Sequence, residues 1–385
     1  MNNSTTVTIS AAASAAGAAI KRRKKLHQYQ SLIPGLPDDI AQICLSHVQP
    51  STLYSVCHSW RRLVYSSSFP SFLSVYSLLK PSQSEKNSVD FANFDPVSAK
   101  WTLLPPPPLN PPLRILLRHP SFISRHLPIQ SVSVSGNFVL LAATTDPLLP
   151  ALSNPLVFNP RTGKWSNGPQ LATPRRWCAA GASHGVVYVA SGVGSHYNPE
   201  VARSVEKWDM NRNNRNHLWE KMNCLKDGKF SREAIEAVGW RGKLCMVNVK
   251  GDAAKEGIIY DVESDSWQEM PEGMLMGWRG PAAAMEEEII YTVDESKGAL
   301  RKYDHRRDCW LDILENEMLK GARHMAAAGG RVCVVSGGGE GIVVVDVVAE
   351  LPRLVVVETP VGFQVLDVHI LPRISQLDSE LHYEI

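Results

Sequence analysis

Side chains that could carry out catalysis are spread thinly through this sequence. Several histidines occur singly, without the close pairs that zinc ligation requires: His184, His196, His305, His324 and His369. The glycine-rich segment 336–341, SGGGEG, lacks the following lysine and serine or threonine of a phosphate-binding loop. No serine lies in the G-x-S-x-G pattern of a nucleophile elbow. The sequence therefore predicts no catalytic residue, no metal site and no cofactor.

Arginines are more informative, because four of them recur ahead of similar segments. Each is followed by small or apolar residues, a turn and a β-rich stretch; the four are Arg176, Arg232, Arg279 and Arg323. In a closed ring of such segments they would gather near one mouth. Arginine suits bidentate recognition of carboxylates on a partner, so we predict a target-binding role. The same residues could instead pair with acids of neighbouring segments, and the sequence leaves both interpretations open.

The elements that would position these arginines are revealed by a second repeat. An aromatic residue, then Asp or Asn, then a tryptophan recur in FDPVSAKW, FNPRTGKW, YDVESDSW and YDHRRDCW, with a fifth, longer copy at 208–219. Successive tryptophans, at 101, 165, 219, 267 and 310, lie 64, 54, 48 and 43 residues apart. This spacing approaches the period of about 40 to 50 residues of one propeller blade. Each unit predicts an inner strand, a tight turn, a second apolar strand and an outer hairpin.

These units resemble the kelch repeat over most of residues 90–360, which implies a β-propeller. Five units and two partial segments, one at each end of the region, predict six blades within residues 73–385. The early segment from FLSVYSLLK to WTLLP would supply outer strands, and GFQVLDVHILP would supply the inner strand of the same blade. Completing one blade from both ends removes exposed sheet edges. A kelch-type copper oxidase would need clustered tyrosine and histidine ligands, which this sequence does not offer.

Residues 31–72 have helical rather than strand periodicity. Pro37, Asp38 and Asp39 suit a helix start, and two stripes of apolar residues at helical spacing predict two short amphipathic helices. Neither helix can bury its stripe alone. One interpretation is a small helical cap on the downstream domain.

The residues LPDDIAQICLSHV and LYSVCHSWRRLV resemble the F-box, which docks on the Skp adaptor of a cullin-scaffolded ubiquitin ligase. The resemblance implies these adaptor-binding residues: Leu36, Pro37, Ile40, Ile43, Leu45, Leu53, Val56, Trp60 and Leu63. The chain as a whole, mostly β with a small α module, resembles plant F-box/kelch-repeat proteins of the Skp-interacting-partner type. That resemblance implies a non-catalytic substrate receptor whose propeller binds a target protein, such as a metabolic enzyme, for ubiquitination and degradation. The alternative function is a kelch interaction scaffold outside any ligase.

Composition sets the remaining expectations. The 385 residues carry a formal net charge of +2, which favours neither nucleic acid nor a membrane surface as a partner. Seven cysteines without a C-x-x-C pair are typical of a reducing compartment. Residues 1–30 are of low complexity and end near KRRKK at 21–25, so we expect a disordered tail. The basic run is either a nuclear import signal or a solvated tail, and an organellar transit peptide remains an alternative; we expect the nucleus, the cytoplasm or both.

Overall fold

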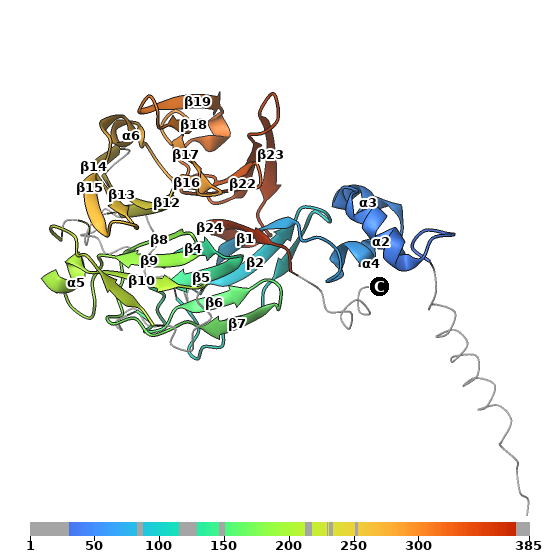
Figure 1. The fold of residues 1–385 in the computed structure, drawn as a ribbon, viewed down its shortest axis with the longest axis horizontal. Helices are drawn as coiled ribbons and strands as arrows, with labels where there is room; N and C mark the ends of the chain where they lie inside the picture. Colours follow the sequence, from blue (N-terminus) through green and yellow to red (C-terminus); the bar gives the residue numbers. More distant parts are fainter. Residues whose placement is uncertain are drawn as a thin grey trace, which may run out of the picture. The chain divides into compact units, whose positions relative to one another are not determined.

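The computed structural model describes residues 31–82, 88–114, 129–145, 151–211, 218–228, 230, 234–250 and 253–374 (Figure 1). The chain divides into two compact units, the first ending at Pro70 and the second running from Ser71 to Ser375. Our predicted boundary lay after residue 72. The predicted tail, 1–30, and its basic run lie outside the described residues.

The described part of the first unit contains three short helices, α2 (Asp38–Ser46), α3 (Pro50–Val56) and α4 (His58–Tyr65). The sequence predicted two, and the second is divided because Cys57 has an extended backbone with φ −156° and ψ 166°. Both α2 and α3 begin next to a proline, which needs no N–H partner at a helix start. The interior of the unit is formed by side chains from all three helices: Ala41, Leu45, Leu53, Leu63 and Val64.

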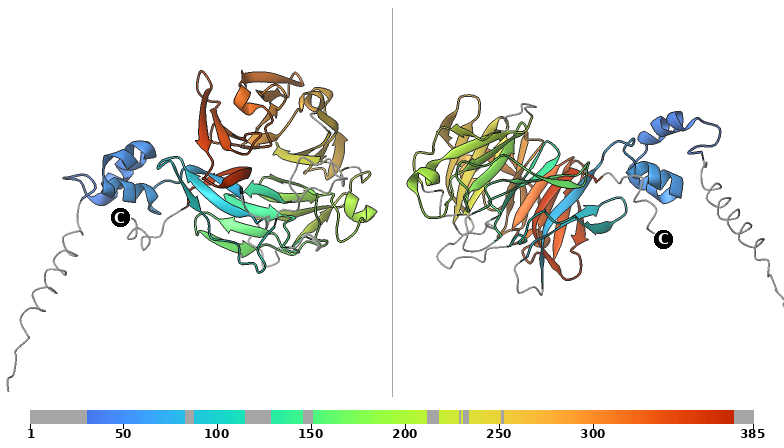
Figure 2. Two further views of the ribbon diagram at one scale, coloured as in Figure 1. Left: turned by 180° about the vertical axis from the view of Figure 1, so that it is seen from behind. Right: turned by 90° about the horizontal axis from the view of Figure 1, so that it is seen from below.

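The second unit consists of six four-stranded antiparallel sheets, the blades of a propeller (Figures 1 and 2). From inside to outside, blade 1 contains β24 (Phe363–Pro372), β1 (Leu73–Pro81), β2 (Asp90–Asp95) and β3 (Lys100–Leu103). Blade 2 contains β4 (Gln130–Val134), β5 (Asn137–Leu141), β6 (Leu156–Asn159) and β7 (Lys164–Asn167). Blade 3 contains β8 (Ala179–Ser183), β9 (Val186–Ala190), β10 (Val205–Asp209) and β11 (Glu220–Met222).

The other three blades repeat this order. Blade 4 contains β12 (Ala234–Trp240), β13 (Lys243–Lys250), β14 (Ala253–Asp261) and β15 (Ser266–Glu269). Blade 5 contains β16 (Ala282–Met285), β17 (Ile289–Asp294), β18 (Ala299–Asp304) and β19 (Cys309–Glu315). Blade 6 contains β20 (His324–Ala328), β21 (Arg331–Val335), β22 (Gly341–Asp346) and β23 (Arg353–Glu358). Short helical segments in the connections include α5 (Pro199–Arg203), α6 (Glu272–Gly277) and η2 (Glu317–Leu319).

The ring closes through the strand from the C-terminal end of the unit. The innermost strands contact one another in the cyclic order β4, β8, β12, β16, β20, β24 and back to β4. Strand β24 pairs antiparallel with β1, from Leu73 opposite Pro372 to Pro81 opposite Phe363. Figures 1 and 2 show this red strand beside the blue β1. The predicted six blades, with one completed from both ends, are confirmed.

The repeated aspartate and tryptophan each have a local structural task. The Asp or Asn closes the turn between the third and fourth strands: the carboxylate of Asp261, for example, accepts the N–H groups of Glu263 and Ser264. The tryptophan indole donates to a carbonyl that lies in the last strand of the preceding blade or in the connection that follows it. The pairs are Trp101 with Glu358, Trp165 with Pro105, Trp219 with Pro169, Trp267 with Asn223 and Trp310 with Met274. The repeat therefore encodes both a turn and a bond between blades.

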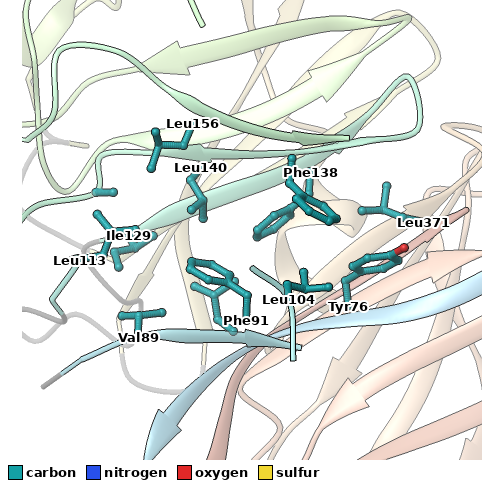
Figure 3. Close-up of a cluster of buried hydrophobic side chains, with 13 residues drawn as sticks. Tyr76, Val89, Phe91, Leu104, Leu113, Ile129, Phe138, Leu140, Leu156 and Leu371 are labelled. Carbon is teal, nitrogen blue, oxygen red and sulfur yellow. The ribbon is translucent and has the colours of Figure 1, made fainter. Parts of the chain in front are cut away.

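The core lies between blades rather than within them. Figure 3 shows the cluster between blades 1 and 2, in which Tyr76 and Phe91 of blade 1 face Phe138 and Leu140 of blade 2. Leu371, from the ring-closing strand, belongs to the same cluster. Its burial means that this seam is complete only when β24 is in place.

Candidate docking surfaces

The helical unit presents apolar side chains that its own interior does not use. Ile40 and Ile43 on α2 are 44% and 60% exposed, and Val56 at the end of α3 is 55% exposed. Leu36 is also exposed, as is Pro37 at the start of α2. A single exposed aliphatic side chain is ordinary, but five within one small unit are typical of an interaction site. We call Leu36, Pro37, Ile40, Ile43 and Val56 the apolar helix surface.

The other predicted adaptor-binding residues have a different place. Leu45, Leu53 and Leu63 are buried, so they support the helices and are not available as direct contacts in this structure. Trp60 is half-buried, and its indole N–H donates to the carbonyl of Leu32 at 2.7 Å. The reason is that α2 has two apolar faces: Ala41 and Leu45 are buried, while Ile40 and Ile43 are exposed. The sequence showed apolar spacing but not which face was internal.

The predicted arginines lie ahead of innermost strands, but not in one common register. Arg176 exchanges both backbone hydrogen bonds with Val193, Arg279 accepts from the N–H of Glu295, and Arg323 donates to the carbonyl of Val335. The backbone partner lies 17 residues after Arg176, 16 after Arg279 and 12 after Arg323. The last distance is shorter because β20 begins directly after Arg323, whereas β8 and β16 begin three residues after their arginines. Although each precedes an innermost strand, these three arginines therefore do not occupy equivalent positions in their blades.

Exposure also differs among these arginines. Arg323 is exposed, whereas Arg176 and Arg279 are half-buried. Arg176 lies over the ring of Trp177, 5.3 Å from its centroid, and Trp177 has a positive φ of 53°. Within the part of the chain that the structure describes, the side chains of Arg279 and Arg323 form no ion pair. Arg232 lies outside the described residues.

The neighbouring Arg175, which no sequence pattern singled out, is the buried arginine of this loop. It is 1% exposed, forms an ion pair with Glu206, and donates to the Ser204 hydroxyl at 2.5 Å and the Ser191 carbonyl at 3.3 Å. These partners belong to the same blade, so Arg175 fastens the loop onto its own sheet. The sequence does show two adjacent arginines, but nothing in the doublet indicates which of them is buried.

The mouth where the innermost strands end is bridged by the turn between β16 and β17. The carboxylate of Glu287 accepts the N–H of His184 in blade 3 at 2.8 and 2.9 Å. Glu286 accepts the N–H of Gly329 in blade 6 at 2.7 Å, and Glu288 pairs with Arg241 in blade 4 at 3.0 Å. Three consecutive glutamates thus tie the turns of three other blades together. Arg176, Arg279 and Arg323 lie at the opposite mouth, where the strands begin.

Other kinds of site were not found in the described residues. No group of three or more His, Cys, Asp or Glu side chains there is arranged to hold a metal ion. All seven cysteines are free thiols. Among the described helices, none has both the length and the apolar character needed to cross a membrane.

A small helical module with an exposed apolar surface, joined to a six-bladed propeller, is the architecture of an F-box protein with kelch repeats. Among curated proteins, the chain is 54% identical over 371 residues to the F-box/kelch-repeat protein SKIP25 of Arabidopsis thaliana, covering 92% of this chain and 94% of that protein. The chain belongs to the plant F-box/kelch-repeat proteins.

More distant relatives belong to the same kind of protein. The F-box protein AFR of the same plant is 25% identical over 278 residues, which cover 68% of each chain. Another Arabidopsis thaliana F-box/kelch-repeat protein is 23% identical over 357 residues, covering 74% of this chain and 71% of that one. No family model matches the chain. A chain in the crystal structure of a nidogen/laminin complex aligns at 9% identity with a TM-score of 0.47, which is too low to carry an argument.

Proposed function

We propose that this protein is the substrate receptor of a Skp–cullin–F-box ubiquitin ligase. In this role the apolar helix surface docks the Skp adaptor, which connects to the cullin, and the propeller binds the protein to be ubiquitinated. The observation that carries the proposal is the exposure of Leu36, Ile40, Ile43 and Val56 on a unit whose interior is already filled. Transfer of ubiquitin is performed by other subunits, so the protein itself needs no catalytic residue.

Binding to the adaptor is the direct test. The full chain is titrated with a purified plant Skp adaptor in a calorimeter, and the mixture with the cullin is analysed by size exclusion. We expect a one-to-one complex with the adaptor that recruits the cullin. Absence of binding by a folded chain would reject the ligase role and leave the kelch scaffold as the function. We further propose the nucleus or cytoplasm as the location and a protein target, such as a metabolic enzyme, as the ligand of the propeller.

For the target, we propose the mouth where the innermost strands begin. The opposite mouth is bridged by Glu286, Glu287 and Glu288, and half-buried Arg279 and exposed Arg323 lie at the mouth that remains. Guanidinium groups bind carboxylates by paired hydrogen bonds, so acidic side chains of the target are the expected partners. Arg176 and Arg232 are the other two proposed target-binding residues.

Charge reversal at this mouth gives the first prediction. Arg279→Glu with Arg323→Glu should reduce proximity labelling of ligase targets at least tenfold, because the new carboxylates repel acidic side chains. Adaptor affinity should stay unchanged. The melting temperature should move by no more than about 1 °C, since neither side chain forms an ion pair within the described residues.

A matched control carries the same change of charge elsewhere. Arg306→Glu with Arg307→Glu alters two exposed arginines in the turn between β18 and β19, and this variant should label targets normally. A fall of several degrees in the melting temperature of the Arg279 and Arg323 variant would instead assign these two arginines a structural role.

A further inference from the structure

Ionisable side chains are rare on the strands that surround the propeller axis. The six innermost strands contain four: Glu236 on β12, His324 on β20, and Asp367 and His369 on β24. Strands β4, β8 and β16 contribute only serine, glutamine, glycine and apolar residues. A buried charge is costly without a partner, so the arrangement of these four groups matters for the stability of the ring.

Three of the four groups form one cluster where β24, the ring-closing strand, contacts its neighbours in blades 6 and 2. The carboxylate of Asp367, itself buried, lies 2.6 Å from Nδ1 of His324 and 3.2 Å from Nε2 of His369. It also accepts the hydroxyl of Ser131, which lies 2.9 Å from Nε2 of His369. The other ring nitrogen of His369 lies 2.9 Å from the hydroxyl of Ser133. We call His324, Asp367, His369, Ser131 and Ser133 the seam cluster.

The seam cluster joins three blades at the place where the ring is closed. His324 belongs to blade 6, Asp367 and His369 belong to the innermost strand of blade 1, and the serines belong to blade 2. Strand β24 follows all the other strands in the chain, so its attachment on both sides decides whether the propeller is closed. The carboxylate of Asp367 contacts both neighbouring blades, and His369 adds contacts to the two serines of blade 2.

The electrostatics of the cluster favour a charged pair. Burial disfavours the imidazolium of His324, but the carboxylate of Asp367 and the more distant Glu236 outweigh burial and raise the pKa of His324 above its usual 6.5. Burial would raise the pKa of Asp367, yet His324 and His369 together hold it well below its usual 3.8. From the innermost strands, His324 also faces Glu236, whose charge raises its pKa, and the imidazole of His369, whose ring centroid lies 6.0 Å from that of His324.

We propose that the seam cluster is a pH-sensitive latch that fastens the ring-closing strand, tightest when His324 is protonated and Asp367 is ionised. The inference does not depend on the proposed ligase function. Because the pKa of His324 is higher in the folded than in the unfolded chain, its contribution to stability is complete below about pH 6.5 and is lost as pH rises through the folded pKa. The contribution of Asp367 is complete above about pH 3.8 and is lost only in stronger acid.

Thermal melts of the full chain between pH 5.5 and 9 test the latch. The melting temperature of the natural protein should exceed that of His324→Asn by about 3 °C at pH 5.5, and the difference should fall toward zero by pH 9. The control His196→Asn removes an exposed histidine elsewhere on the propeller and should show no such pH-dependent difference. A difference between the natural protein and His324→Asn that is constant across this range would overturn the proposal.

Hydrogen exchange gives a second measurement, in which two strands of the natural protein are compared with each other. After correction for intrinsic rates, protection of β24 amides should fall between pH 6 and pH 9, whereas protection of β13, on the far side of the ring, should not. Equal behaviour of the two strands would reject a latch at the seam. Asp367→Asn should abolish the selective change, because an amide cannot hold the proton on His324.

Discussion

Removal of residues 361–385 is expected to unfold the entire propeller rather than to fray one blade. This truncation takes away β24, whose Val365, Val368 and Leu371 are buried between blades. It leaves β1 with an unpaired edge and opens the contacts of blade 1 with both β20 and β4. Scanning calorimetry should show the loss of the main cooperative transition, and proteolysis should cut the propeller throughout.

Two point variants distinguish the loss of packing by β24 from a general effect of changes in the C-terminal region. Val368→Asp places a carboxylate at a fully buried position and should lower the stability by about 4 kcal/mol. Val361→Asp makes the same change at a fully exposed position and should melt like the natural protein. A truncated chain that retained the parent melting transition would contradict closure by β24.

Loss of adaptor binding is the second large expected effect. Ile40→Ser with Ile43→Ser removes two aliphatic side chains from the apolar helix surface. Burial of each in an interface contributes about 1.5 kcal/mol, so the pair should weaken Skp adaptor binding about 100-fold. The melting temperature should hardly change, because both side chains are exposed in the free protein.

Two comparisons make this result specific. Val355→Ser removes an exposed aliphatic side chain from β23 of the propeller and should bind the adaptor normally. Leu53→Ser should also reduce adaptor binding, but through unfolding of the helical unit, because Leu53 is fully buried there. Unchanged affinity of the Ile40 and Ile43 variant in calorimetry would show that the adaptor uses a different surface.

Much of the fold could be predicted from the sequence because its signals are local. The turn formed by Asp261 depends on residues two and three positions later, and Trp267 follows within the same hairpin. Such short-range patterns recur once in each unit and identify the blades without knowledge of their neighbours. The helix starts at Pro37 and Pro50 are equally local, and the family that these segments resemble is confirmed by a relative that matches 92% of the chain.

The candidate sites depended on contacts that the sequence does not display. Which face of α2 is internal was decided by tertiary packing, so Leu45 became core while Ile43 remained exposed. The same is true of the doublet Arg175 and Arg176, where a bond to Glu206 buried the first residue and left the second near the mouth.

The histidines show the difference most clearly. In the sequence, His324 and His369 are isolated residues in separate repeats, and no spacing rule connects them. In the folded ring, β24 returns beside β20, and both histidines reach the carboxylate of Asp367. The sequence alone determined the blades and the helical module, because turns and periodicity act over a few residues. Only the tertiary structure decided which polar groups meet, because ring closure joins segments from opposite ends of the propeller.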